Sequence, residues 1–111
     1  MIPRAVFEKS GGFDEHYFLF NEDVDLCRVI HQNGFKVMYF PLAEITHYVS
    51  TSNSKVPVEI IMKRHRGMRH YYGKHHGKNP LTKVAVNIAI TLRCLSQLAF
   101  NIFKETQDPA K

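Results

Sequence analysis

Charged residues are divided unevenly along this chain of 111 residues, and the division restricts how its two halves can be used. Residues 8–25 contain six acids and one base, whereas residues 55–94 contain nine bases and one acid. An acidic segment is suited to a catalytic or metal-binding site, and a basic one to a surface that faces anions. The formal charge of +5 therefore describes neither half.

Length and composition place the chain among small globular proteins. A domain contains about 100–200 residues, so we expect one small domain rather than a two-lobed enzyme. A content of 44% hydrophobic and 23% charged residues argues against disorder. Cys27 and Cys94 form no CxxC pair, which argues against a zinc ribbon or a disulfide-rich scaffold and favours a reducing compartment. We expect no signal peptide, because acids and glycines precede any long apolar run.

Helix signals dominate the front half. Pro3 predicts the start of a short helix, which the glycine pair at Gly11 ends. A second helix is predicted over residues 22–33, with Asn21 as its N-cap, acids in its first turn and a stop at residues 33–34.

Two strands are predicted after this helix. Residues 35–40 are rich in aromatic and β-branched side chains and end at Pro41, and residues 42–49 form a weaker strand. Residues 50–57 read as a polar connecting loop. We therefore expect an α+β fold in which helices surround a small strand pair.

The back half, residues 57–111, is predicted to be a helical tail, distinct from residues 1–56. A basic helix is expected from Val58 to about Gly73, and residues 81–103 form a long apolar segment. Arg93 lies inside that segment, and an arginine at the centre of a bilayer costs about 2.5–3.5 kcal/mol on insertion scales. We therefore favour an amphipathic helix that packs on the protein or lies on a membrane surface.

The acids at the start of the second helix are the first candidates for chemistry. Asp25 and Arg28 share a helix face and are expected to pair, which leaves Asp23 to face elsewhere. The helix dipole keeps a carboxylate at this end ionised, as a general base requires. The alternative is that these acids only stabilise the helix.

The histidines are the second candidates. His47 ends a predicted strand and could bind a metal through a neutral imidazole. The histidines of the basic helix show no metal-binding spacing and are expected on its solvated surface: His65, His70, His75 and His76. Cys27 and His31 are four residues apart, but Cys27 is expected to pack in the core.

Residues 63–78 interleave bases with aromatic side chains. Such a segment can bind nucleic acid, anionic lipid or a diphosphate, or it can be a solvated helix face. It contains no motif that reads a DNA groove or binds RNA.

Residues 11–47 resemble the carboxyl-terminal half of the catalytic domain of family 2 inverting glycosyltransferases, and the rhamnosyltransferase-like members most. The likeness rests on several motifs in the same order: Gly11-Gly12-Phe13-Asp14-Glu15, Phe18-Leu19-Phe20, Glu22-Asp23-Val24-Asp25-Leu26-Cys27-Arg28, Gly34 with residues 35–39, Pro41 and His47. The Tyr-Tyr-x-Lys-His element of residues 71–75 is similar to the tails of the same enzymes.

The resemblance implies a fold and an activity. It implies part of a GT-A α/β nucleotide-sugar transferase fold, with Asp23 as the general base that deprotonates the acceptor hydroxyl. It implies an acceptor site at Gly12, Asp14, Glu15 and Glu22, and Mg²⁺ or Mn²⁺ with His47 as a ligand. The implied partners are a nucleotide-sugar donor and a saccharide or lipid-linked acceptor, and no nucleic acid. The implied location is the cytoplasm, with peripheral contact at the inner face of the membrane.

The family's Asp-x-Asp motif and nucleotide-binding sheet have no counterpart before residue 11. The chain is therefore expected to be part of a larger enzyme and inactive alone. Two alternatives from other classes stay open: a basic module, residues 58–104, that binds anionic membrane or nucleic acid, and a scaffold without catalysis.

Overall fold

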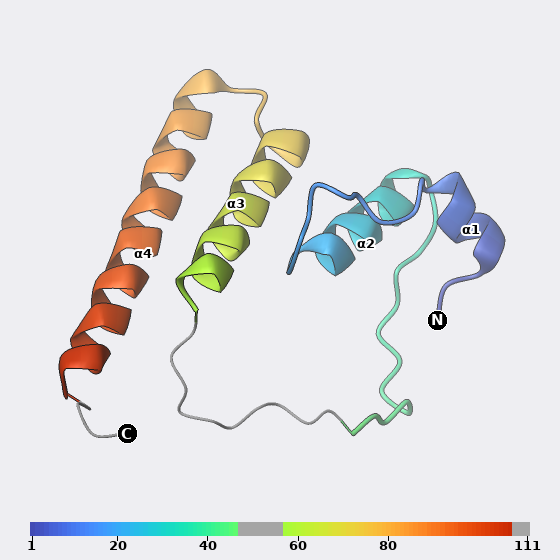
Figure 1. Ribbon diagram of the computed structural model, residues 1–111. Helices are drawn as coiled ribbons and strands as arrows, with labels where there is room; N and C mark the ends of the chain where they lie inside the picture. Colours follow the sequence, from blue (N-terminus) through green and yellow to red (C-terminus); the bar gives the residue numbers. More distant parts are fainter. Residues whose placement is uncertain (47–56, 108–111) are drawn as a thin grey trace.

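The computed structural model describes residues 1–46 and 57–107, the last four of these by backbone only. Four helices follow one another along the chain: α1 (Arg4–Lys9), α2 (Glu22–Gln32), α3 (Val58–His75) and α4 (Pro80–Gln107). Figure 1 shows α3 between α4 on one side and α2 on the other, with α1 at the far end beside α2. All four helices expected from the sequence are therefore present.

The predicted boundaries of α2 are confirmed, although its start is built differently. Phe20 and Asn21 both adopt left-handed backbone conformations, with φ of 65° and 71°. Asn21 therefore makes no side-chain cap, and its Nδ2 is buried without a hydrogen-bond partner. Gly34, at φ 84°, ends the helix in the conformation that glycine adopts without strain.

The predicted strand pair, and with it the α+β fold class, is wrong. Residues 35–46 form no strand in the part of the chain that the structure describes, and residues 47–49 of the second prediction lie outside that part. Val37, Tyr39 and Ile45 are 50%, 89% and 87% exposed. A strand needs a neighbour for its backbone hydrogen bonds and its apolar face, and this segment has neither within the described residues.

α3 and α4 form an antiparallel hairpin (Figure 1). Ile61 on α3 and Ile90 and Cys94 on α4 are buried, and the Cys94 thiol lies 3.8 Å from the Met62 sulfur. The contact is apolar along its length, as expected for a helix of this composition that packs on its neighbour.

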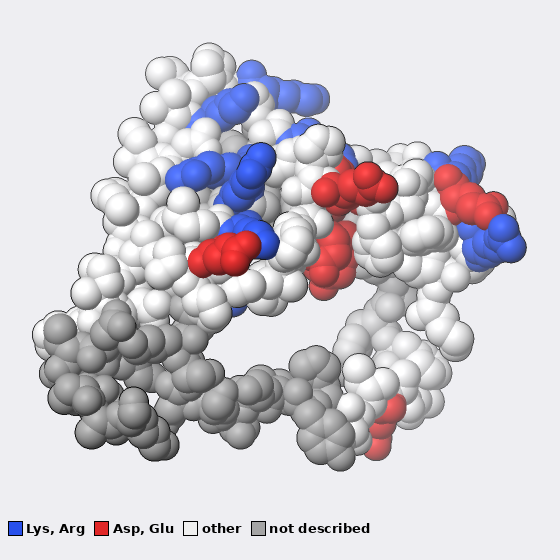
Figure 2. Space-filling view, viewed as in Figure 1, with Lys and Arg blue, Asp and Glu red and all other residues white. Residues whose placement is uncertain are grey.

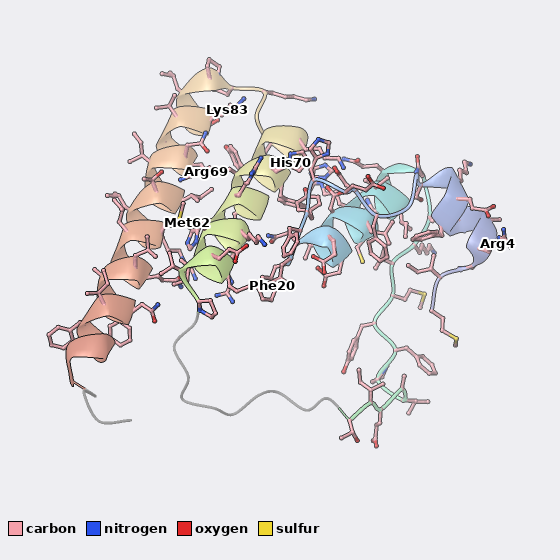
Figure 3. All side chains as sticks on the ribbon, in the orientation of Figure 1. Arg4, Phe20, Met62, Arg69, His70 and Lys83 are labelled. Carbon is pink, nitrogen blue, oxygen red and sulfur yellow. The ribbon has the colours of Figure 1, made fainter. Side chains whose placement is uncertain are left out.

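α3 meets the front half through the loop that precedes α2. A Cβ added at Gly67 would lie 3.1 Å from Asn21 Nδ2 and 3.4 Å from the Phe20 carbonyl oxygen. The α3 bases Lys63 and Arg64 lie over the Phe18 and Phe20 rings, 3.3 and 4.6 Å from the ring centroids. Figure 3 shows Phe20 beside the lower end of α3. The left-handed turn that opens α2 is thus held against α3.

Candidate functional site at the border of α2 and α3

Two acids of the front half converge on one lysine of α3. The Lys74 ammonium donates hydrogen bonds to Asp14 Oδ2 at 2.7 Å and to Asp25 Oδ2 at 2.8 Å. Figure 2 shows bases gathered over α3 and the start of α4, with acids facing them at the border with α2. The charge division of the sequence is therefore resolved by direct contact between the halves.

Histidines and a tyrosine complete this cluster. His75 Nε2 lies 2.6 Å from Asp25 Oδ1, which also accepts a hydrogen bond from the Tyr17 hydroxyl at 3.0 Å. Asp14 is bonded in turn by His70 Nε2 at 3.0 Å and His16 Nδ1 at 2.8 Å. We call these seven residues the charge cluster: Asp14, His16, Tyr17, Asp25, His70, Lys74 and His75.

Both carboxyl groups in the cluster favour the ionised form. The hydrogen bond from Lys74 holds the pKa of Asp14 far below its ordinary value. Burial raises the pKa of Asp25, but the hydrogen bonds from Lys74, His75 and Tyr17 outweigh it, so that the net pKa is lowered. Burial lowers the pKa of Lys74, and its two carboxylate partners reverse this and raise it. The lysine is therefore held as a cation between two anions.

Three sequence expectations are corrected here. Asp25 pairs with Lys74 and His75 rather than with Arg28, because its side chain is 3% exposed and points toward α3. His70 and His75 contact carboxylates and His65 is buried, its Nδ1 lying 2.7 Å from the Ile61 carbonyl oxygen, so these three are not solvated surface. His76 is exposed, as expected.

Asp23, the residue predicted as general base, lies outside the charge cluster. It is exposed in the first turn of α2, where its Oδ1 accepts a hydrogen bond from the Val24 backbone N–H at 2.8 Å. The neighbouring Glu22 Oε2 is buried and has no hydrogen-bond partner among the described residues. The start of α2 therefore presents one accessible carboxylate and one buried, unsatisfied acceptor.

The remaining predicted residues are scattered. Gly12 has φ 70°, and a Cβ there would touch the Phe7 ring at 3.4 Å. Glu15 is exposed on the same loop as Asp14, whose two oxygens are already engaged. Cys27 is exposed, so its predicted place in the core is wrong. His47 lies outside the described residues.

One group in the cluster could hold a metal ion by distance alone. Asp14, His16 and His70 offer ligand atoms that all lie within 4.8 Å of one another. The Lys74 ammonium, however, sits on Asp14 Oδ2 and would have to leave. Mg²⁺ also prefers oxygen ligands, whereas two of these three donors are nitrogens. This set does not fit the Mg²⁺ implied by the resemblance, and we route no chemical step through it.

The sequence signal for the cluster was the charge division itself. Asp25 and Lys74 are 49 residues apart, and no local spacing rule links positions at that distance. The Tyr-Tyr-x-Lys-His element did single out Lys74 and His75, without indicating their partners.

Comparison with known proteins gives two bacterial relatives. Over 76 residues the chain is 32% identical to an N-acetylglucosaminyl-diphospho-decaprenol L-rhamnosyltransferase of Mycobacterium tuberculosis, which covers 68% of this chain and 25% of that protein. Over 53 residues it is 36% identical to the rhamnosyltransferase WbbL of Escherichia coli K12, covering 48% of this chain and 20% of that protein. No family model and no solved structure matches the chain.

The chain spans about a quarter of the length of the mycobacterial relative. Over the matched residues it is related to proteins named as glycosyltransferases. The resemblance seen in the sequence is confirmed at that level.

Proposed function

We propose that this chain supplies the acceptor side of a glycosyltransferase that acts with inversion. The enzyme would move a sugar, with rhamnose the first to test, from a nucleotide-sugar donor to a cell-surface polysaccharide or glycolipid acceptor. The relation to two proteins named rhamnosyltransferases supports the reaction class. The contrast between two acids on α2 supports the choice of base, because Asp25 is committed to the charge cluster and Asp23 is accessible.

The proposed role of Asp23 follows from its position. Its carboxylate lies in the first turn of α2, where the unpaired backbone N–H groups and the helix dipole favour the anion. An anionic carboxylate can take the proton from an acceptor hydroxyl as the oxygen attacks the anomeric carbon. The bond to the nucleoside diphosphate then breaks on the opposite side of the sugar, which inverts the configuration.

The acceptor is proposed to bind between the Gly12–Glu15 loop and the start of α2. The buried Glu22 Oε2 is an unsatisfied acceptor that a sugar hydroxyl could donate to, and such atoms are uncommon in folded proteins. Asp14 would act here through the loop that it anchors to α3, because its own oxygens are engaged. The divalent cation and His47 as its ligand are proposed on the resemblance alone.

A chimera tests the reaction class. The matched segment of the mycobacterial relative is replaced by the corresponding residues of this chain, and rhamnosyl transfer to the relative's own acceptor is measured. We expect transfer above background by the chimera and none by the 111 residues alone.

Circular dichroism and donor binding serve as controls for the chimera. A chimera that is folded and binds donor like its parent, yet transfers no sugar, would count against the proposal. So would appreciable transfer by the 111-residue chain, because the account places donor binding outside it.

A further inference from the structure

α4 is apolar on two opposite faces, and only one of them is covered. The face with Ile90 and Cys94 packs on α3 and is buried. The other carries a row of exposed apolar side chains at spacings of three and four residues, which we call the outer stripe: Leu81, Val84, Ile88, Leu92, Leu95 and Ile102. These side chains are 55–79% exposed. An uncovered apolar row of this length on a charged protein marks a binding surface.

Basic residues border this stripe. The Arg69 guanidinium donates a hydrogen bond to Thr91 Oγ1 at 2.9 Å, and Thr91 lines a shallow groove together with Val84, Ile88 and Leu92. Figure 3 shows Arg69 between α3 and α4. Arg66 lies three residues earlier on the same face of α3 and is exposed. Residues 57–103 carry eight bases and one acid in all.

We propose that the outer stripe binds the surface of an anionic lipid bilayer. α4 would lie in the plane of the interface with its stripe among the acyl chains, while Arg66 and Arg69 reach lipid phosphates. This inference rests on the α3–α4 hairpin and stands apart from the proposed sugar transfer.

Two other occupants fit the observations less well. The window Pro80–Phe103 is long and apolar enough to cross a membrane, and 11% of it is buried inside the molecule. Spanning, however, would place Arg93 near the bilayer centre, whereas lying flat leaves it in water. A second copy of the chain would bring two basic hairpins together, and residues 80–103 offer no acid for pairing charges across a helix seam.

The test uses the whole 111-residue chain and vesicles of phosphatidylglycerol mixed with phosphatidylcholine, or of phosphatidylcholine alone. We expect sedimentation with the anionic vesicles and at least about tenfold weaker binding to the neutral ones. Ile88→Asp and Leu92→Asp place a charge in the stripe and should each weaken binding at least about tenfold.

Thr82→Asp is the matched control, because it adds the same charge at an exposed position of α4 outside the stripe. It should weaken binding no more than about fivefold, the effect of one charge near the surface. Circular dichroism verifies that each variant is helical, and Leu92→Asp replaces Ile88→Asp if one variant misfolds.

Three results would overturn the proposal. The first is no binding to either vesicle, and the second is an equal loss in Thr82→Asp and Ile88→Asp. The third is a dimer in solution that Ile88→Asp dissociates while vesicles bind nothing, which would assign the stripe to a second copy.

Discussion

At the scale of single residues, two acids on one helix have different surroundings. Asp23 and Asp25 are two positions apart on α2, a spacing that points their side chains in different directions. Asp25 is directed at α3, where Lys74 and His75 neutralise it, and Asp23 is directed at solvent. The same type of side chain therefore stabilises the fold at one position and is available for chemistry at the other.

Substituting Asp25 should cost far more stability than substituting Asp23. Asp25→Asn removes a buried partner of Lys74 and His75, and breaking a buried ion pair costs about 3–5 kcal/mol. Lys74 is one third exposed and keeps Asp14, so we expect a loss of about 2 kcal/mol, after discounting for screening by solvent. Asp23→Asn should change the free energy of unfolding by less than about 0.5 kcal/mol. Urea unfolding of both variants decides, and equal losses would contradict the assigned roles.

The charge cluster also makes stability depend on pH. The folded-state pKa values of Asp14 and Asp25 are lowered, so their contribution is complete above the unfolded pKa of about 4 and is lost as the pH falls further. The pKa of Lys74 is raised, so its contribution is complete below about pH 10.5 and is lost at higher pH.

We therefore expect a stability plateau between about pH 4 and pH 10, measured by thermal unfolding. Asp14→Asn should reduce the acid-side loss by about 1 kcal/mol, and Asp23→Asn should leave it unchanged. An unchanged acid slope in Asp14→Asn would show that the cluster does not hold the fold.

At the scale of elements, α3 connects the molecule because its faces meet different neighbours. Gly67, His70 and Lys74 recur at helical spacing and meet the front half, whereas Arg69 reaches α4. The closest backbone approach is at Gly67, under the left-handed turn at Phe20 and Asn21. A glycine is needed there for space rather than for backbone freedom.

Two glycines of α3 should therefore respond in opposite ways to alanine. A Cβ at Gly73 meets nothing within 4 Å, so Gly73→Ala should stabilise by about 0.5–1 kcal/mol through helix propensity. At Gly67 the added methyl group crowds Asn21 and Phe20, and we expect a net loss of about 1 kcal/mol. Thermal unfolding of the two variants measures the difference, and a stabilising Gly67→Ala would refute the close contact.

The helices were predictable because their signals are local. The acids at the start of α2, Gly34 at its end and the apolar period of residues 81–103 each act within a few positions. Residues 35–40 have strand-forming composition, but a strand also needs a partner, which composition does not supply. The contacts of Asp25 with Lys74 and His75 depend on tertiary packing, so the charge division could only suggest that the halves meet.

At the scale of the whole molecule, the chain is extended. Its radius of gyration is 17.8 Å, against about 13 Å for a compact domain of this length. Apolar side chains stand exposed in two places, the outer stripe of α4 and the segment from Val37 to Ile45. The chain also spans only a quarter of its mycobacterial relative.

Hydrogen exchange should reflect this division. We expect the amides of α2 and α3 to be protected in the isolated chain and those of Val37, Met38 and Tyr39 to exchange at close to the unfolded rate, because no ladder protects them. Protection at alternating positions of this segment would restore a strand and contradict the structure.

The account depends most on Asp23 as the proposed base. The direct measurement is the turnover of the rhamnosyltransferase chimera that carries Asp23→Asn, with donor affinity measured in parallel and Glu59→Gln, an exposed acid on α3, as the control. Loss of a general base should lower turnover about 10²–10⁴-fold, with donor affinity and the Glu59→Gln variant unaffected. Turnover within about twofold of the unsubstituted chimera would remove Asp23 from the reaction.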